Sequence, residues 1–288
     1  MSLRIPASRS ARGSVTTGGA DFDWTGSASQ VEDSERLAAL YDLQFDAREE
    51  DVDWARRLAA RTGGPILELA CGSGRIAVPL ASDGRRVVGL DASAAMLARA
   101  RDRAARAGVE ARFVEGDMRD FSLDETFALI LIPFSSFLHL APGDRFACLA
   151  RVREHLNAQG RFAFDVFQPD PEKIAARDGG LIEEASFDDP ETGERITRFS
   201  SGVATVDRTT FTWRFDCIGA DHVVRRYERV VTLHFLYRRE LELMLDAAGF
   251  ALEELHGDYD GSPADERSPR LLAVARRRER GEARERRR

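Results

Sequence analysis

Two glycines and three carboxylates lie where a chain of this pattern could bind a nucleotide-type cofactor. Glu68 lies inside the short apolar run Ile66–Leu69, which leads directly into a turn containing Gly72 and Gly74. Glycines in such a turn let the backbone bend tightly and let a ligand approach without a Cβ in the way. The unpaired N–H groups at the start of the following helix would then point at that ligand.

The glycine pattern alone also fits a dinucleotide site. Gly72 and Gly74, followed by Ala77 and then Asp91, satisfy the fingerprint of dinucleotide-binding folds. Glu68 argues against a dinucleotide site, because a carboxylate just ahead of the first glycine suits a ligand bearing a cation and suits a pyrophosphate poorly. The alternative interpretation of Glu68 is an ordinary acid at the end of a strand.

The positions of the acids follow from a regular alternation of strands and helices. We expect strands over 66–69, 86–91, 111–115, 127–132 and 160–167, and helices over 76–81, 96–107 and 142–157. The fourth strand is wholly apolar, which is typical of a central strand buried on both faces. Glu68, Asp91 and Asp117 then meet at the carboxyl ends of three strands, where open α/β sheets bind ligands. Asp91 is placed to accept ribose hydroxyls.

The second half of the chain changes pattern and then returns to it. Residues 171–236 alternate as antiparallel strands do, with a hairpin turn at Gly219–Asp221, and we expect this insertion to cover the substrate and to contact a second copy of the chain. A helix over 238–248 and strands over 250–256 and 271–275 follow.

The predicted fold is therefore α/β and Rossmann-like. We expect a mostly parallel seven-stranded sheet with helices on both faces, and an antiparallel β insertion after strand five. The predicted divisions are a flexible lead-in over 1–34, a core with two N-terminal lid helices over 35–170, the insertion over 171–236, a closing helix and hairpin over 237–276, and a charged tail over 277–288.

Composition excludes several classes of protein. A net charge of −7 and a pI near 5.4 argue against a general nucleic-acid binder. No apolar run has the length needed to cross a membrane. Cys71, Cys148 and Cys217 are few and widely spaced, which favours a reducing compartment, so we expect a cytoplasmic protein. No His/Cys cluster has metal-ligand spacing, and we expect no metal.

The pattern Glu68-x-x-x-Gly72-x-Gly74 resembles motif I of the class I methyltransferases that use S-adenosylmethionine, and the closing helix and hairpin agree. The stretches 116–123 and 134–140 are similar to N,N-dimethyltransferases that act on nucleotide-linked amino sugars. The resemblance implies S-adenosylmethionine as cofactor and S-adenosylhomocysteine as product. It also implies that Asp117 accepts the adenine amino group and that Met118 packs on the ring. The predicted cofactor site is completed by Ala70, Ala92 and Ile132.

Methyl transfer is a direct displacement, to which an enzyme contributes mainly alignment and exclusion of water. The resemblance places Tyr41 near the sulfonium and places His139 in the crevice, where an unperturbed pKa of about 6.5 suits a proton acceptor. The alternatives are that Tyr41 is a core aromatic residue and that His139 satisfies a backbone group.

Four further residues are predicted to contact the substrate. They are Phe134, Asp165, Tyr227 and Arg238. A capping or hairpin role is the alternative for Asp165, and a place in the small core of the insertion is the alternative for Tyr227 and Arg238.

The predicted function is transfer of a methyl group to an N or O atom of a small-molecule acceptor, such as an amino sugar or another secondary metabolite. One alternative is a protein that binds the cofactor without turnover, and another is a methyltransferase acting on a macromolecule. Methylation of a nucleic-acid base is disfavoured, because the fourth strand exits through Ile132-Pro-Phe-Ser135 instead of an Asn/Asp-Pro-Pro-aromatic run. We expect no membrane partner and a homodimer formed through the insertion.

Overall fold

The computed structural model describes residues 28–175 and 179–278. Two helices, α1 (Ala28–Phe45) and α2 (Glu50–Thr62), precede the first strand. The first of them begins at Ala28, ahead of the expected start at Glu35. Residues 1–27 of the predicted lead-in and 279–288 of the predicted tail lie outside the described residues.

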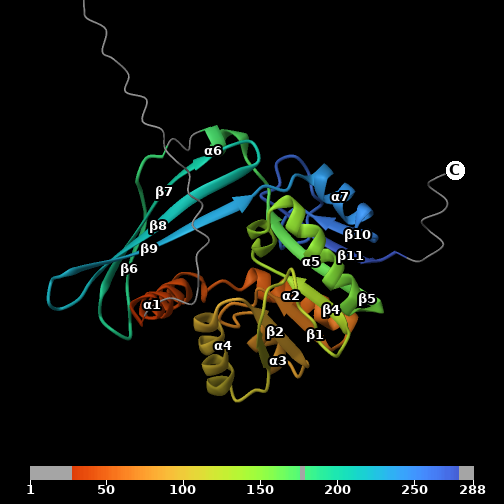
Figure 1. Ribbon diagram of the computed structural model, residues 1–288, viewed down its shortest axis with the longest axis horizontal. Helices are drawn as coiled ribbons and strands as arrows, with labels where there is room; N and C mark the ends of the chain where they lie inside the picture. The colour runs from red at the N-terminus through yellow and green to blue at the C-terminus, as the bar shows by residue number, and fades with distance from the viewer. Residues whose placement is uncertain (1–27, 176–178, 279–288) are drawn as a thin grey trace, which may run out of the picture.

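A seven-stranded sheet forms the centre of the molecule (Figure 1), with strand order β10-β11-β5-β4-β1-β2-β3. The strands are β1 (Ile66–Leu69), β2 (Val87–Asp91), β3 (Arg112–Glu115), β4 (Phe127–Ile132), β5 (Leu156–Phe167), β10 (Phe250–His256) and β11 (Arg270–Arg277). The first five run parallel to one another, and β11 runs antiparallel to both of its neighbours. This confirms the predicted mostly parallel sheet.

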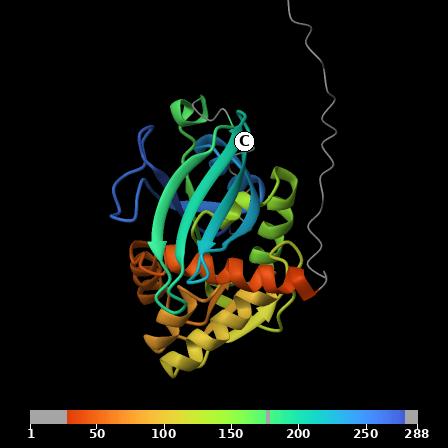
Figure 2. The same ribbon diagram turned by 90° about the vertical axis from the view of Figure 1, so that its left-hand side faces the viewer.

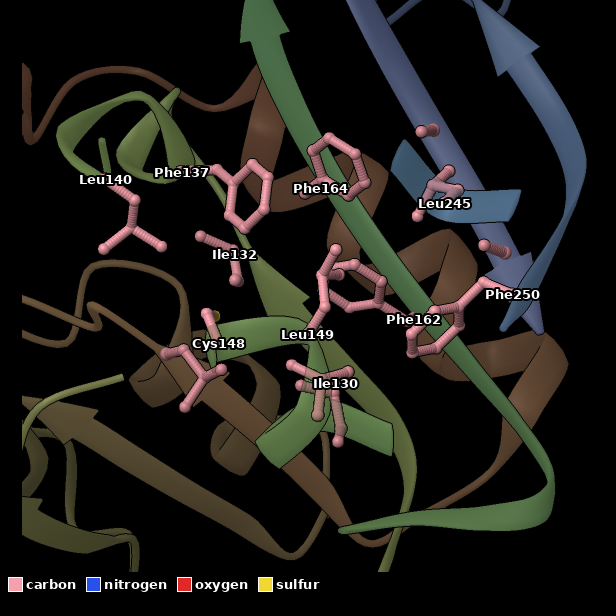
Figure 3. Close-up of a cluster of buried hydrophobic side chains, with 14 of the residues drawn as sticks. Ile130, Ile132, Phe137, Leu140, Cys148, Leu149, Phe162, Phe164, Leu245 and Phe250 are labelled. Atoms are coloured by element: carbon pink, nitrogen blue, oxygen red, sulfur yellow. The ribbon is translucent and has the colours of Figure 1, made fainter. Parts of the chain in front are cut away.

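Helices cover both faces of this sheet, as predicted. They are α3 (Ala77–Ser82), α4 (Ala94–Ala107), the 3₁₀ turn η1 (Ser136–His139), α5 (Pro142–His155) and α7 (Arg238–Ala247). On one face, η1, α5 and α7 pack on a core that includes the buried rings of Phe137, Phe162, Phe164 and Phe250, as Figure 3 shows. On the other face, α2 and α3 pack on a second core.

The fifth strand begins earlier than its sequence pattern predicts. The expected helix over 142–157 ends at His155, and Leu156 is already extended and pairs with Phe127. Leu156 is fully buried, so burial of its side chain against β4 outweighs continuation of the helix.

The insertion forms a separate four-stranded antiparallel sheet, called sheet B here, which follows the short helix α6 (Pro171–Ala175). Its strands are β6 (Ile182–Asp188), β7 (Arg195–Ala204), β8 (Arg208–Ile218) and β9 (Val224–His234), paired in that order. In Figures 1 and 2, α1 runs between sheet B and the rest of the fold. Leu40 of α1 packs with three buried side chains of sheet B: Ile196, Phe215 and Cys217. The predicted antiparallel insertion is confirmed.

Within the described residues, no helix combines the length and the apolar character needed to span a bilayer.

Candidate active site

The turn after β1 has the backbone shape that its glycines allow. Ala70, Gly72 and Gly74 all have positive φ, at 55°, 55° and 76°. A Cβ added at Gly72 would meet no atom within 4 Å, whereas one at Gly74 would lie 3.2 Å from Ala100 Cβ. Gly72 therefore leaves space for a ligand, and Gly74 allows α4 to pack closely against the turn.

Asp91 joins the end of β2 to this turn. One carboxylate oxygen accepts the backbone N–H of Gly72 at 2.8 Å, and the other accepts that of Ser93 at 2.8 Å. Burial raises the pKa of Asp91, and these two N–H groups act in the opposite direction. Each oxygen keeps a second lone pair, and the side chain is partly accessible, so Asp91 can still accept ribose hydroxyls.

Glu68 is buried without a full set of partners. Its side chain is 2% exposed, and its Oε2 atom has no hydrogen-bond partner. Burial raises the pKa of Glu68 well above its usual range, and the nearby charge of Arg75 opposes that rise. A buried carboxyl oxygen without a partner is costly, so the site favours a ligand that brings a cation or a hydrogen-bond donor to it.

A buried ion pair fixes the wall beside Glu68. Arg75 donates to both oxygens of Asp51, one of them at 2.8 Å, and to the Arg48 carbonyl at 3.1 Å. The guanidinium groups of Arg75 and Arg48 lie 5.1 and 5.2 Å from the centre of the Phe134 ring. The glycine turn, the start of α2 and the exit of β4 are thereby held together.

The lid helix α1 is tied to the cofactor turn by Asp42. This buried carboxylate accepts the Ser73 hydroxyl at 2.5 Å and the Arg99 guanidinium at 2.6 Å. The preceding residue, Tyr41, packs against Phe45 with ring centres 4.7 Å apart. Burial raises the pKa of Tyr41 to about 12, so its phenol is protonated at neutral pH. Asp42 therefore fixes α1, the helix that carries Tyr41, against the cofactor turn.

His139 ends the short 3₁₀ turn that follows β4. Its side chain is open to solvent on one side, while the protein around the rest of the ring and the charge of Arg229 lower its pKa to about 4. The same Arg229, on β9, also acts electrostatically on Tyr41 and Asp91. The lid helix, the end of β2, the turn after β4 and sheet B thus converge on one region.

Asp165 stabilises the turn that leads from β4 to His139. It is fully buried and accepts the backbone N–H groups of Phe134 at 2.6 Å and Ser135 at 3.1 Å. Both residues have a left-handed φ of 57°, a conformation that costs energy for side chains other than glycine. Burial raises the pKa of Asp165 to about 6. Asp165 was predicted to contact substrate, but its carboxylate has no exposed surface and instead holds the turn that carries Phe134.

The residues predicted to bind adenine lie at the end of β3. The carboxylate of Asp117 accepts the guanidinium of Arg119, which also reaches Asp144 at 3.2 Å, and Arg119 lowers the pKa of Asp117. Met118 packs against the hydrophobic core. The predicted adenine contact therefore requires Asp117 to share its oxygens with Arg119.

The remaining predicted residues fall into different environments. Ala92 is exposed and Ile132 is fully buried. Tyr227 packs in the small core between α1 and sheet B. Arg238 is exposed and contacts Glu242 at 3.1 Å and the Ala264 carbonyl at 3.0 Å, not the residues around His139. The structure therefore gives Tyr227 and Arg238 structural contacts.

Two contacts of the site were not predicted from the sequence. The Asp51–Arg75 pair and the Asp42–Ser73 contact join distant parts of the chain and leave no local signal. Arg229 does give a local signal in the sequence, because it occupies a position on the strand face that otherwise carries Tyr227, Val231 and Leu233. A charged residue in an apolar alternation indicates either an ion pair or a ligand.

The fold and this site together define a class I S-adenosylmethionine-dependent methyltransferase. The unpartnered oxygen of Glu68 suits the cofactor's positive charge, the open side of Gly72 gives it room, and Asp91 suits its ribose. Residues 66–160 match the family model described as a methyltransferase domain.

Curated and solved relatives agree with this assignment. The chain is 31% identical to the dTDP-3-amino-3,6-dideoxy-alpha-D-glucopyranose N,N-dimethyltransferase of Streptomyces fradiae, over 81% of this chain and 90% of that protein. It is similar to the structure of Streptomyces venezuelae DesVI, with a TM-score of 0.67, 27% identity and coverage of 84% and 98%.

It is also similar to the S-adenosylmethionine-bound structure of CalS10, an amino pentose methyltransferase from Micromonospora echinaspora, with a TM-score of 0.65, 26% identity and coverage of 84% and 96%. The chain belongs to the S-adenosylmethionine-dependent methyltransferases. The predicted cofactor, enzyme class and fold are confirmed.

Proposed function

We propose that this methyltransferase acts on the nitrogen of an amine carried by an amino sugar. The names of the Streptomyces fradiae and Micromonospora echinaspora relatives specify amino-sugar acceptors, and the first also specifies N,N-dimethylation. Both similarities extend over most of this chain, 81% and 84% of it, which is more than the cofactor-binding half.

The proposal is carried by the placement of His139 on η1 and Tyr41 on α1, two elements that both pack against β9. An amine attacks through its lone pair, so it must be unprotonated when it reaches the methyl group. The pKa of His139 is lowered to about 4, so the ring is neutral at pH 7 and can accept an N–H hydrogen bond that orients the lone pair. A hydroxyl acceptor needs a stronger base, since its proton must be removed for attack, and a group of this pKa supplies little help.

The chain's other residues supply binding and shielding. S-adenosylmethionine supplies an electrophilic methyl group on its sulfonium when bound. Glu68 and Asp91 would hold its charged and ribose parts, and the half-buried Tyr41, Phe134 and Trp213 would shield the transfer position from water. Excluding water strengthens the electrostatic contacts and prevents side reactions.

A matched pair of acceptors tests this function. We would compare dTDP-linked 3-amino-3,6-dideoxyglucose with dTDP-linked 6-deoxyglucose, which has a hydroxyl at the same carbon, and measure release of S-adenosylhomocysteine. The proposal expects turnover with the amine and none with the hydroxyl. Equal turnover with both sugars, or turnover with the hydroxyl alone, would overturn the assignment to nitrogen.

The outer face of sheet B supports a second part of the proposal, a homodimer. Val203 is 57% exposed and Val230 is 66% exposed on that face, beside the Arg214–Glu228 ion pair. An apolar and charged sheet face of this kind can pair with itself about a two-fold axis. Light scattering at micromolar concentration checks this, and a monomeric mass would contradict it.

We also propose a cytoplasmic location. Cys71, Cys148 and Cys217 are all free and buried, which suits a reducing compartment. Fractionation of the producing cells, followed by detection of the protein with an antibody, would show whether it is found in the cytoplasm.

A further inference from the structure

Arg229 lies on the inner face of sheet B, above the site. It pairs with Trp213 across the β8–β9 ladder and shares its strand face with Tyr227 and Val231. The elements packed against β9 include α1, which carries Tyr41, and η1, which carries His139. The side chain is half-buried, so its charge is kept inside the fold and partly away from water.

In the part of the chain that the structure describes, no acidic side chain pairs with Arg229, although the carboxylate of Asp91 acts on it electrostatically. Arg229 forms no hydrogen bond or ion pair within residues 28–175 and 179–278. Its neighbours on the same strand differ, since Arg225 pairs with Asp221 at 2.6 Å and Arg226 pairs with Asp216 at 2.6 Å. A partly desolvated cation without a partner costs stability, and such a cost at a site is explained most simply by a role there.

Arg229 acts on groups of both the cofactor site and the expected transfer position. Its charge acts on His139, on the phenol of Tyr41 and on the carboxylate of Asp91. Burial is the main cause of the lowered pKa of His139, and the charge of Arg229 lowers it further. Tyr41 also faces Arg75 and two carboxylates, those of Asp51 and Asp42. A positive charge in this place makes any further protonation nearby unfavourable.

We propose that Arg229 is a positioning residue that keeps both His139 and the acceptor's amine unprotonated at the methyl-transfer position. The part concerning the amine rests on the proposed function, and the part concerning His139 does not. An ammonium ion entering beneath Arg229 is repelled, while a neutral amine is not. The guanidinium thereby selects the protonation state that can attack, and it leaves His139 free to accept a hydrogen bond.

The first test uses the protein without cofactor or acceptor. The His139 ring signal is identified by its loss in His139→Asn and is titrated by NMR in the wild type, Arg229→Gln, Arg229→Lys and the matched control Arg226→Gln. We expect the pKa of His139 to rise in Arg229→Gln and to stay near the wild-type value in the other two variants. No rise in Arg229→Gln overturns the proposal.

Folding of the variant is checked by its melting temperature. Because Arg229 is an unpaired charge, Arg229→Gln is expected to melt no lower than the wild type. Should it fail to fold, Arg229→Met keeps the apolar stem and removes the charge, and the same rise is expected there.

The second test separates the amine from the cofactor. With an amino-sugar acceptor, the acidic limb of kcat should move to higher pH in Arg229→Gln and return in Arg229→Lys, because kcat reports groups in the bound complex. Affinity for S-adenosylhomocysteine, measured by calorimetry, should change less than threefold. A loss of tenfold or more in Arg229→Gln alone would show that Arg229 binds the cofactor's carboxylate, and would overturn the proposal.

Discussion

The backbone N–H of Phe134 donates to a carboxylate oxygen of Asp165 at 2.6 Å, deep inside the protein. This contact joins the end of β5 to the exit of β4, where two successive residues adopt a left-handed conformation. Ser135 strengthens the junction, because its own N–H also donates to Asp165 and its hydroxyl accepts the N–H of Phe167 at 3.0 Å. The turn that precedes His139 is therefore determined by a side chain from another strand.

Asp165→Asn should disturb this turn while leaving the cofactor site intact. The amide has only one oxygen, so one backbone N–H loses its partner, and we expect turnover to fall about 10- to 100-fold because alignment is lost. Affinity for S-adenosylhomocysteine should not change, since Glu68 and Asp91 lie on other strands. A variant with wild-type turnover would contradict the role given to Asp165.

The wild type and Asp165→Asn should also differ in how their free energies of unfolding depend on pH. Burial raises the pKa of Asp165 to about 6 in the folded protein, against about 3.9 for an unperturbed aspartate. The folded state therefore binds the proton first, and ionised Asp165 costs stability above pH 6, a cost that is relieved as pH falls towards 4. Relative to Asp165→Asn, the wild type should gain up to about 3 kcal/mol between pH 7 and pH 4 in urea unfolding. A constant difference across that range would contradict the shift.

The buried pair of Asp51 and Arg75 should be costly to break. Arg75→Met leaves the Asp51 carboxylate buried without compensation and removes the positive charge near Glu68, so we expect a loss of about 3–5 kcal/mol in urea unfolding. Replacing both partners, as Asp51→Leu with Arg75→Met, should recover much of that loss. Arg226→Met, which breaks an exposed pair on sheet B, is the control and should cost much less, because an exposed ion pair is screened by water. A similar small loss in Arg75→Met would show that the pair is not structural.

Glu68 should release a proton when the cofactor binds. Burial raises the pKa of Glu68, so the free protein holds it protonated over a wider pH range, and a bound cation lowers that pKa again. Cofactor affinity should consequently rise with pH until Glu68 ionises in the free protein. Calorimetry in two buffers with different ionisation enthalpies should give different observed enthalpies for the wild type and equal ones for Glu68→Gln. Equal values for both proteins would mean that Glu68 does not change its protonation.

Much of the fold was predictable because its signals are local. The apolar run Phe127–Ile132 has to be buried on both faces, and it became the centre of the sheet. Gly72 and Gly74 predict a turn that few other residues can form. Glu68 and Asp91 lie close to this turn in the sequence. The cofactor side of the site depends on these short-range patterns, so its prediction was confirmed at the level of cofactor and fold.

The acceptor side depends on contacts between distant segments. In the sequence, Asp165 is a polar residue near the end of a strand. Only the pairing of β4 with β5 shows that it is fully buried and stabilises a turn. His139 was expected to have an ordinary pKa, but burial of its ring lowers that pKa, and the charge of Arg229 on sheet B adds to the effect. Sequence alternation gives the two faces of a strand but not which face meets α1, so the position of Arg229 against α1 and η1 could not be predicted.

His139 should not control the pH dependence of turnover above pH 5. With a pKa of about 4 it is already neutral there, so the acidic limb of kcat belongs to the acceptor's amine. We expect His139→Asn to lower kcat about 10- to 100-fold through lost orientation and to leave the limb at the same pH. Disappearance of a limb near pH 6 to 7 in the variant would instead identify His139 as the proton acceptor originally predicted.

Binding of S-adenosylmethionine should depend most directly on Asp91. Calorimetric titration of S-adenosylmethionine should show binding to the wild type and to the control Asp216→Ala, whose carboxylate lies on sheet B in an ion pair with Arg226. Asp91→Ala should bind more weakly by about 1–3 kcal/mol, because the ribose hydroxyls lose their acceptor and the turn at Gly72 loses its tie. No binding of nicotinamide adenine dinucleotide is expected with any of the three proteins. Unchanged affinity in Asp91→Ala, or binding of the dinucleotide in place of S-adenosylmethionine, would contradict the cofactor site described above.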